Sequence, residues 1–447
     1  MKRLLMFLCF LVVPIFLSAP VFAGSVSLKV WSSPDNADTL SELAKQFTQD
    51  NPDVGIEVTP ISWEILYPQI LSDIRSGTGA FDVATWDLMT AGSIADGFLD
   101  LTVFGKGHPD LVDPDFDQPD FIPQAWHVYG MWGTKNIGYP FYGAAMLFFY
   151  RKDLFENPSL QAAFKAKYRK DLKVPATWQD ATSVAEFFTQ SANPKSPTKY
   201  GITLMIPRSH TTFYMFLDWF GSLRRSREAV ARMGKVDLDW GDYFTADHKP
   251  AFASPEGVKA MQQIRAILKY SPDPLASDYG ETLEAFGKGL AAMVPTWSAA
   301  LSSWAQEPTL QPIDQKVGIA VVPGGTPASG GWGLGINAAS KQQEAAFRFV
   351  QFATNKQADK LRWLKFRLGP TRKSTTRDAE VLADAPWMAD VYVKSLDQSS
   401  QRPRIPQQPK LDDLTSGWIT DMLAGRYGTN DSASLARLAA EWEKILQ

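Results

Sequence analysis

The sequence predicts an α/β fold with a mostly parallel sheet. In its amino-terminal part, short segments rich in β-branched residues alternate with segments whose apolar residues recur at helical spacing. Strands that alternate with helices are typical of parallel sheets. Ligands of such sheets bind beyond the carboxyl ends of the strands, where Trp31 and Trp86 stand. Strands are expected at residues 27–31, 55–60 and 81–86, and helices at residues 38–48 and 63–76.

A second α/β region is expected after residue 138. Ser254 and Pro255 indicate a helix start, because serine caps an amino-terminal turn and proline suits its first position. Residues 330–335 are rich in glycine and could act as a hinge. Residues 402–409 are expected to form an extended, proline-rich connector rather than a core element. Further strands are expected at residues 146–150 and 200–206, and helices at 178–190, 212–223, 254–270, 343–352 and 435–446.

The composition bounds the class of protein. A chain of 447 residues suggests two domains, or three. Its hydrophobic content of 45% and charged content of 21% are those of a folded globular protein and exclude a wholly disordered chain. The formal net charge of -3 argues against nucleic acid as a partner. The aromatic content of 12%, with 15 Trp, raises the prospect of a ligand site lined by rings.

The first residues have the pattern of a secretory signal peptide. Lys2 and Arg3 precede an apolar run at residues 4–17, and Ala23 ends the segment as a small residue. The run is shorter than a membrane span needs, which disfavours an anchor. We expect cleavage after Ala23, so that residues 1–23 are removed and the mature protein is periplasmic. The single cysteine, Cys9, leaves with the signal, so the mature chain is expected to have no disulfide.

The common catalytic and metal motifs are missing from the sequence. The four His are not paired at metal spacing, and neither a nucleophile elbow nor a phosphate loop occurs. No cofactor and no metal are therefore expected. Residues 113–120 carry alternate carboxylates like a calcium loop, but Gln118 and Gln124 occupy the glycine and glutamate positions, which favours a solvated turn and leaves calcium open. Paired carboxylates for glycoside hydrolysis stay open, because their separations are unknown from sequence.

Six stretches in order along the mature chain resemble the extracellular solute-binding proteins of sugar ABC importers, the group of maltose-binding protein. They include a strand–helix start, a Gly-x-Pro stretch with a later Tyr-x-Lys-Asp-Leu-Phe, a Pro-x-Thr-Trp helix start and a Gly-x-Ala-Ala-Met run. Arg151 departs from the pattern, because the family often has Asn there. The stretches are residues 28–31, 138–155, 175–180, 286–297, 330–332 and 340–349.

The resemblance implies two α/β lobes, joined by a hinge of several crossings, that close on a sugar between them. The amino-terminal lobe would comprise residues 24–138 and about 335–367, and the carboxy-terminal lobe residues 139–334 and about 368–447. Trp86 and Trp297 are the strongest site candidates, because motif and strand-end position agree. The full set of residues expected at the ligand is Trp31, Asp35, Asn36, Trp63, Trp86, Asp87, Tyr142, Arg208, Ser209, His210, Trp240, Trp297, Gly331, Trp332 and Arg372.

These residue types suit a sugar. Indole and phenol rings pack on the C–H faces of a pyranose, and charged or amide groups bond its hydroxyls. We therefore expect a monomeric periplasmic receptor without catalysis, which binds a sugar or polyol and delivers it to the transmembrane permease of an ABC importer. The alternative is a secreted carbohydrate-active enzyme, similar to glycoside hydrolases, with an aromatic cleft and two carboxylates.

Overall fold

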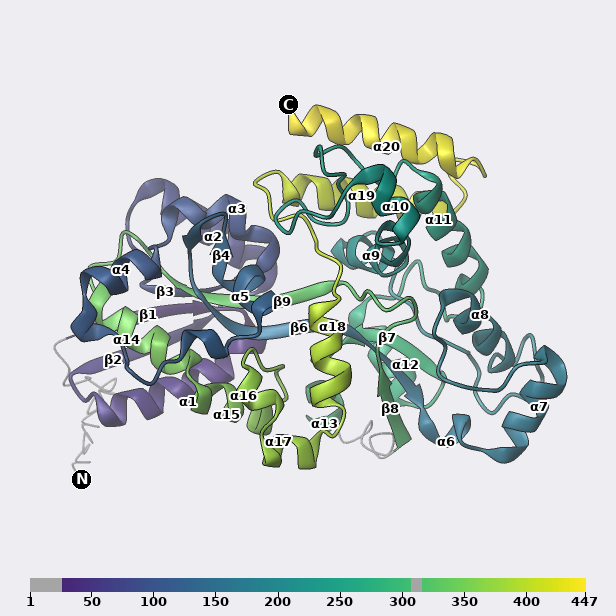
Figure 1. Ribbon diagram of the computed structural model, residues 1–447, viewed down its shortest axis with the longest axis horizontal. Helices are drawn as coiled ribbons and strands as arrows, with labels where there is room; N and C mark the ends of the chain where they lie inside the picture. The colour runs from purple at the N-terminus through teal and green to yellow at the C-terminus, as the bar shows by residue number, and fades with distance from the viewer. Residues whose placement is uncertain (1–25, 307–315) are drawn as a thin grey trace, which may run out of the picture.

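The computed structural model describes residues 26–306 and 316–447 of the chain (Figure 1). The expected signal peptide, residues 1–23, lies outside the described residues. Within the described ranges, no helix is long and apolar enough to cross a membrane.

One mixed sheet of seven strands runs through the molecule. Its order is β2-β1-β3-β9-β6-β7, with β8 also paired to β6. The first three strands are parallel, whereas β9, β7 and β8 pair antiparallel with their neighbours, so the expectation of a mostly parallel sheet is correct only for the amino-terminal part. A separate pair is formed by β4 (Met131–Trp132) and β5 (Lys135–Asn136). The main strands are β1 (Val26–Ser32), β2 (Val54–Pro60), β3 (Val83–Asp87), β6 (Tyr139–Arg151), β7 (Met293–Trp297), β8 (Val317–Ala320) and β9 (Ser329–Ile336).

Strands β6 and β9 connect two lobes (Figure 1). The first half of β6, from Tyr139 to Ala145, pairs with β9, which in turn pairs with β3. The second half, from Met146 to Arg151, pairs with β7 and β8. One core packs around β1, β2 and β3, and a second around α8, α9, α11 and α19. We call these halves the amino-terminal lobe and the carboxy-terminal lobe.

Helices cover both lobes, and their starts follow simple rules. α1 begins at Pro34, earlier than the expected residue 38, because proline occupies the first helical position directly after Ser33. α11 begins at Pro255, and the Ser254 side chain accepts from the Gly257 N–H as expected. In the amino-terminal lobe lie α1 (Pro34–Asp50), α2 (Trp63–Ser76), α3 (Ala91–Ile94), α4 (Leu101–Gly107), α5 (Pro123–Gly130), α14 (Gln343–Thr354) and α15 (Lys356–Phe366).

The remaining helices belong mainly to the other lobe. They are α6 (Lys152–Phe155), α7 (Pro158–Tyr168), α8 (Trp178–Phe187), α9 (His210–Arg224), α10 (Arg227–Met233), α11 (Pro255–Leu268), α12 (Tyr279–Gly287), α13 (Ala300–Gln306), α19 (Gln408–Leu423) and α20 (Asp431–Leu446). Short helices α16 (Lys373–Thr376), α17 (Ala379–Asp384) and α18 (Val393–Asp397) run beneath the crossing strands in Figure 1.

Two expected elements differ from the structure. Residues 200–206 form no strand, although residues 201–206 are buried. Their N–H groups bond to separate segments of the chain: that of Thr203 to the carbonyl of Met293 in β7, and that of Ile206 to the carbonyl of Pro274. Residues 402–409 start out extended but are not a surface connector. Arg402 is 3% exposed and Arg404 0% exposed, so charged side chains of this segment lie inside the protein.

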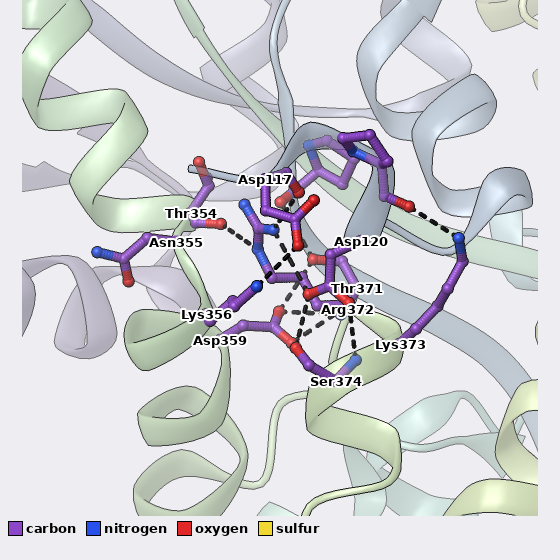
Figure 2. A network of polar contacts seen from close by, with 12 residues as sticks. Asp117, Asp120, Thr354, Asn355, Lys356, Asp359, Thr371, Arg372, Lys373 and Ser374 are labelled. Carbon is purple, nitrogen blue, oxygen red and sulfur yellow. Dashed lines mark hydrogen bonds and ion pairs between the residues drawn. The ribbon is translucent and has the colours of Figure 1, made fainter. Parts of the chain in front are cut away.

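Arg372, expected at the ligand, is instead a structural residue (Figure 2). Its fully buried guanidinium lies 3.9 Å from the centroid of the Phe121 ring and donates to the carbonyls of Thr354 at 2.8 Å and Asp117 at 3.0 Å. Burial is possible because carbonyls and rings replace the water that solvates the cation.

The acidic turn at residues 113–120 belongs to the same network. Asp117 pairs with Lys356 at 2.7 Å, and Asp120 accepts from the backbone and side chain of Ser374. Cations and hydroxyls thus occupy these carboxylates. In the part of the chain that the structure describes, no group of three or more His, Cys, Asp or Glu could hold a metal ion.

Asp359 organises the centre of this network (Figure 2). It is fully buried, accepts from the N–H and hydroxyl of Thr371 at 2.9 Å each, and pairs with the buried Arg362 at 3.1 Å. We predict that Asp359→Ala lowers the free energy of unfolding by ~3–5 kcal/mol, because Arg362 would keep its charge without a partner. Urea denaturation measures the change.

The matched control is Asp171→Ala. Asp171 pairs with Lys165 at 3.0 Å, but its side chain is 52% exposed, so water replaces the lost partner and the change should stay within about 1 kcal/mol. Equal effects of the two substitutions would contradict the role given to Asp359.

Candidate functional site

A cavity of about 440 Å³ lies between the two lobes. It is located at the carboxyl ends of β1 and β3, where ligands of α/β sheets bind. The crossing strands form its floor through Tyr142, Ala144 and residues 330–332. The other lining residues are Ser33, Pro34, Asp35, Trp63, Glu64, Asp87, His210, Thr211, Tyr214, Asp278, Tyr279, Gly280, Trp297, Ala299 and Arg402.

Four helices begin at this cavity, two from each lobe. The first N–H groups of a helix have no partner within the helix and carry partial positive charge, so they can donate to oxygen atoms of a ligand. Side-chain caps fix two of the starts: Ser209 accepts from the Thr211 N–H at 3.3 Å, and Asp278 accepts from the Tyr279 N–H at 2.8 Å. The helices are α1, α2, α9 and α12, whose first residues are Pro34, Trp63, His210 and Tyr279.

Aromatic rings supply the apolar part of the wall. Trp297, at the end of β7, is half-buried and meets the Tyr214 ring edge-on at 4.8 Å. It packs over Gly330, where a Cβ atom would lie 2.8 Å from the indole. Trp332 and Tyr142 are paired across β9 and β6 and are mostly buried, and burial raises the pKa of the Tyr142 phenol. The wall of the cavity therefore contains several aromatic rings that are packed against the crossing strands or against each other.

Gly331 explains part of the glycine run at residues 330–335. Its φ of 107° lies in the region that favours glycine, and a Cβ there would lie 2.5 Å from the Tyr142 carbonyl oxygen and 2.6 Å from the Tyr129 ring. Close packing of rings against β9 thus requires glycine here. Gly331 pairs with Gly143 of β6, whereas the pairing of β9 with β3 covers only Trp332 to Ile336.

The charges of the cavity are mostly negative. Among the described residues that line it, Arg402 is the single guanidinium or ammonium group, against the carboxylates of Asp35, Glu64, Asp87 and Asp278. Arg402 is already paired with Asp87 at 3.0 Å and donates to the Ser329 carbonyl at 3.1 Å. The cavity therefore has acceptors for hydroxyl groups but no free cation for an anionic ligand.

The carboxylates differ in their proton affinity. Desolvation by the surrounding protein raises the pKa of Asp35. In contrast, hydrogen bonds from its own backbone N–H and from the Ser62 hydroxyl lower the pKa of Glu64. Desolvation lowers the pKa of His210, which favours its neutral ring at pH 7.

The structure brings eight of the expected site residues to the cavity. They come from both lobes and from the crossing strands, as the two-lobe prediction requires. These residues are Asp35, Trp63, Asp87, Tyr142, His210, Trp297, Gly331 and Trp332.

Trp86, expected to be a principal ligand contact, lies in the core. It is 1% exposed and packs with the apolar residues of the amino-terminal lobe. Side chains alternate along a strand, so Asp87 faces the cavity while its neighbour Trp86 points to the opposite face. Its ring fills the space left by Gly333, where a Cβ would lie 2.3 Å from the indole.

Five further candidates do not line this cavity. Trp31 stacks on Phe81 at 4.8 Å, and Trp240 stacks on His248 at 3.9 Å. Buried Asn36 donates to the Ser33 hydroxyl, exposed Arg208 pairs with Asp421, and Ser209 borders an adjoining hollow rather than the main cavity.

The residues that sequence reasoning missed fall into two groups. Asp278 and Tyr279 start a helix with a capping box, a pattern that the sequence shows and that could have placed them. Arg402 had no such signal, because a charged residue at the start of a proline-rich segment is typical of a surface connector. Tyr214 sits on a helix that is buried nearly all round, so its position gave no hint of a cavity.

The fold and the site now agree with one family. The model of the bacterial extracellular solute-binding proteins matches residues 31–360. The chain therefore belongs to the family of bacterial extracellular solute-binding proteins. The members of this family are binding proteins. The predicted family and the two-lobe periplasmic binding protein fold are confirmed.

Several individual proteins are similar to this chain. A probable amino-acid ABC transporter periplasmic-binding protein of Sinorhizobium fredii is 26% identical and covers 78% of this chain and 73% of its own. The mannitol-binding protein of Pseudomonas aeruginosa is 25% identical over 85% of this chain and 81% of its own. An ABC transporter solute-binding protein of Agrobacterium radiobacter K84, solved in complex with ribitol, is 27% identical, covers 94% of this chain and 99% of its own, and superposes with a TM-score of 0.74.

We predict that Trp86→Ala lowers the free energy of unfolding of the ligand-free protein by ~3–5 kcal/mol, because it leaves a cavity in the core. Trp31→Ala, which removes a half-buried ring of the same lobe, should cost less. Thermal and urea denaturation compare the two variants. An unchanged stability of Trp86→Ala would contradict the core assignment.

The buried carboxyl of Asp412 should make the stability of the protein depend on pH. This carboxyl, 3% exposed, borders the adjoining hollow, and its Oδ2 atom has no hydrogen-bond partner among the described residues. Burial raises the pKa of Asp412 from 3.8 to about 7. The folded state therefore favours the protonated form of Asp412. The stabilisation that this proton contributes is fully present below pH 3.8 and is lost as the pH rises through about 7.

We predict that Asp412→Asn stabilises the ligand-free protein at pH 8 by on the order of 2–4 kcal/mol and changes it much less at pH 4, because the amide cannot ionise. Melting temperatures at the two pH values measure this. Asp413→Asn, at the exposed neighbouring position, is the control and should show little pH-dependent difference. An Asp412→Asn effect independent of pH would refute the assignment.

Proposed function

We propose that the protein is the periplasmic receptor of an ABC-type importer, which captures an uncharged sugar or polyol between its lobes and delivers it to the membrane permease. The observation that carries this proposal is the cavity between the lobes, where half-buried Trp297 and four helix starts surround a space with several carboxylates. Rings contact C–H groups, carboxylates accept from hydroxyls, and helix N–H groups donate to them.

The charges favour an uncharged ligand over an amino acid. The carboxylate of an amino acid would face the carboxylates of Asp35, Glu64 and Asp278, and the cavity's guanidinium, Arg402, is already paired with Asp87. The names of the similar proteins differ on this point: one refers to an amino acid, one to mannitol, and a solved structure holds ribitol. The chemistry of this cavity supports the polyols.

We also propose how the protein is exported, where it works and what it binds. A signal peptide at residues 1–23 is cleaved after Ala23, the mature protein works in the periplasm as a monomer, and the permease is its partner. The lobes comprise residues 24–138 with about 335–367, and 139–334 with about 368–447. Closure takes place around the crossing strands β6 and β9, and the protein performs no catalysis.

One observation favours the second candidate, a glycoside hydrolase. The cavity holds several carboxylates, and the pKa of Asp35 is raised while that of Glu64 is lowered, which is the direction of difference that an acid and a base need. Incubation with oligosaccharides separates the two functions. The receptor returns them intact, whereas cleavage products would establish the enzyme and overturn the proposal.

Calorimetric titration with ribitol, D-mannitol and common monosaccharides tests the receptor. We predict reversible binding of at least one of them, and that Trp297→Ala weakens it by ~2–4 kcal/mol, about 30- to 1000-fold in Kd. The matched control is Trp240→Ala, because this half-buried indole stacks on His248 away from the cavity. Equal loss in both variants, or binding of none of the compounds, would contradict the proposal.

A further inference from the structure

A second hollow of about 230 Å³ adjoins the ligand cavity. The two spaces share three lining residues: Trp63, Glu64 and His210. They therefore lie on the two sides of one thin wall.

A ring pair stands in this wall beside Glu64. The indole of Trp63 and the imidazole of His210 stack with their centroids 4.6 Å apart and their planes inclined by 24°. Trp63 is the first residue of α2, in the amino-terminal lobe, and His210 is the first residue of α9, in the carboxy-terminal lobe. The pair thus spans the space between the lobes.

Aromatic and charged groups of both lobes surround His210. Its ring meets the edge of the Tyr214 ring at 5.8 Å, and the carboxylates of Asp278, Asp87 and Glu64 and the guanidinium of Arg402 act on it from the facing elements. The lowered pKa of His210 favours a neutral ring, which stacks on the indole without a charge to desolvate.

The second hollow has the same chemistry as the ligand cavity. Tyr67 and Trp63 provide rings, Asp412 and Asp413 provide carboxylates, and three residues provide hydroxyls. The hydroxyl residues are Thr90, Ser209 and Ser416. A second sugar unit would find partners there if the wall were absent.

We propose that the Trp63–His210 pair determines the length of the ligand. The pair closes the main cavity against a second sugar unit, so that the protein selects an alditol or monosaccharide over a disaccharide. This inference rests on the proposed function and adds the residues that set its specificity. Specificity is a difference of affinities, and a wall against the longer ligand produces it.

The test is His210→Ala, which removes one ring of the pair and joins the two spaces. Calorimetric titrations with D-mannitol and with the disaccharide alditol maltitol give the ratio of their Kd values. The ratio in the wild type should favour mannitol, and His210→Ala should shift it toward maltitol by about tenfold or more. His210→Phe retains a flat ring and should keep the wild-type ratio. This variant therefore separates the effect of losing the ring from the effect of changing the first residue of α9.

A second substitution tests where the longer ligand goes. Tyr67 borders the second hollow and not the main cavity. As a single substitution, Tyr67→Ala should leave mannitol binding unchanged. Combined with His210→Ala, it should reduce the affinity for maltitol that His210→Ala alone has gained. Circular dichroism and melting curves confirm that each variant is folded.

The outcomes distinguish this inference from the proposed function. If the wild type binds mannitol or ribitol but His210→Ala leaves the ratio of Kd values unchanged, the role given to the Trp63–His210 pair is wrong, whereas the proposed receptor function is retained. Equal affinity of the wild type for maltitol and mannitol would also contradict the role of the ring pair without contradicting the receptor function. If the wild type binds no sugar or polyol of any length, both proposals fail.

Discussion

A single strand, β6, carries the constraint on which the rest of the structure depends. Its first half pairs with β9 in one lobe, and its second half pairs with β7 and β8 in the other. Neither core can therefore form without the strand that also completes its partner. The cavity lies above this strand, so Tyr142 and Ala144 take part in the backbone ladder and in the wall at once. The floor of the site is as rigid as the sheet.

The sequence was sufficient for the α/β order, for most helix positions and for eight residues of the cavity, because hydrophobic periodicity and cap residues are local signals. It failed where the outcome depends on contacts distant along the chain. Trp86 and Asp87 differ by one position, and only the pairing of β3 decides which of them faces the cavity. Arg402 is buried because Asp87 lies opposite it, more than three hundred residues earlier in the chain.

The polar groups of the cavity are arranged around the first turns of helices. Helix starts bring N–H donors toward the ligand, and the carboxylates of Asp35, Glu64 and Asp278 stand at these same starts, where the helix dipole stabilises negative charge. Hydrogen-bond donors and acceptors thus lie side by side around a space whose net charge is negative. A ligand whose hydroxyls both donate and accept matches such a surface better than a ligand with a fixed charge.

The glycines of β9 have a consequence for how this protein can diversify. At Gly330, Gly331, Gly333 and Gly335, an added Cβ atom would lie within 3 Å of a ring or a carbonyl oxygen. A side chain at any of these four positions would collide with its neighbours, so we do not expect new ligand preferences to arise from substitutions of these glycines. They can arise at the helix starts, whose side chains tolerate replacement without disturbing the sheet. Libraries for altered specificity belong there.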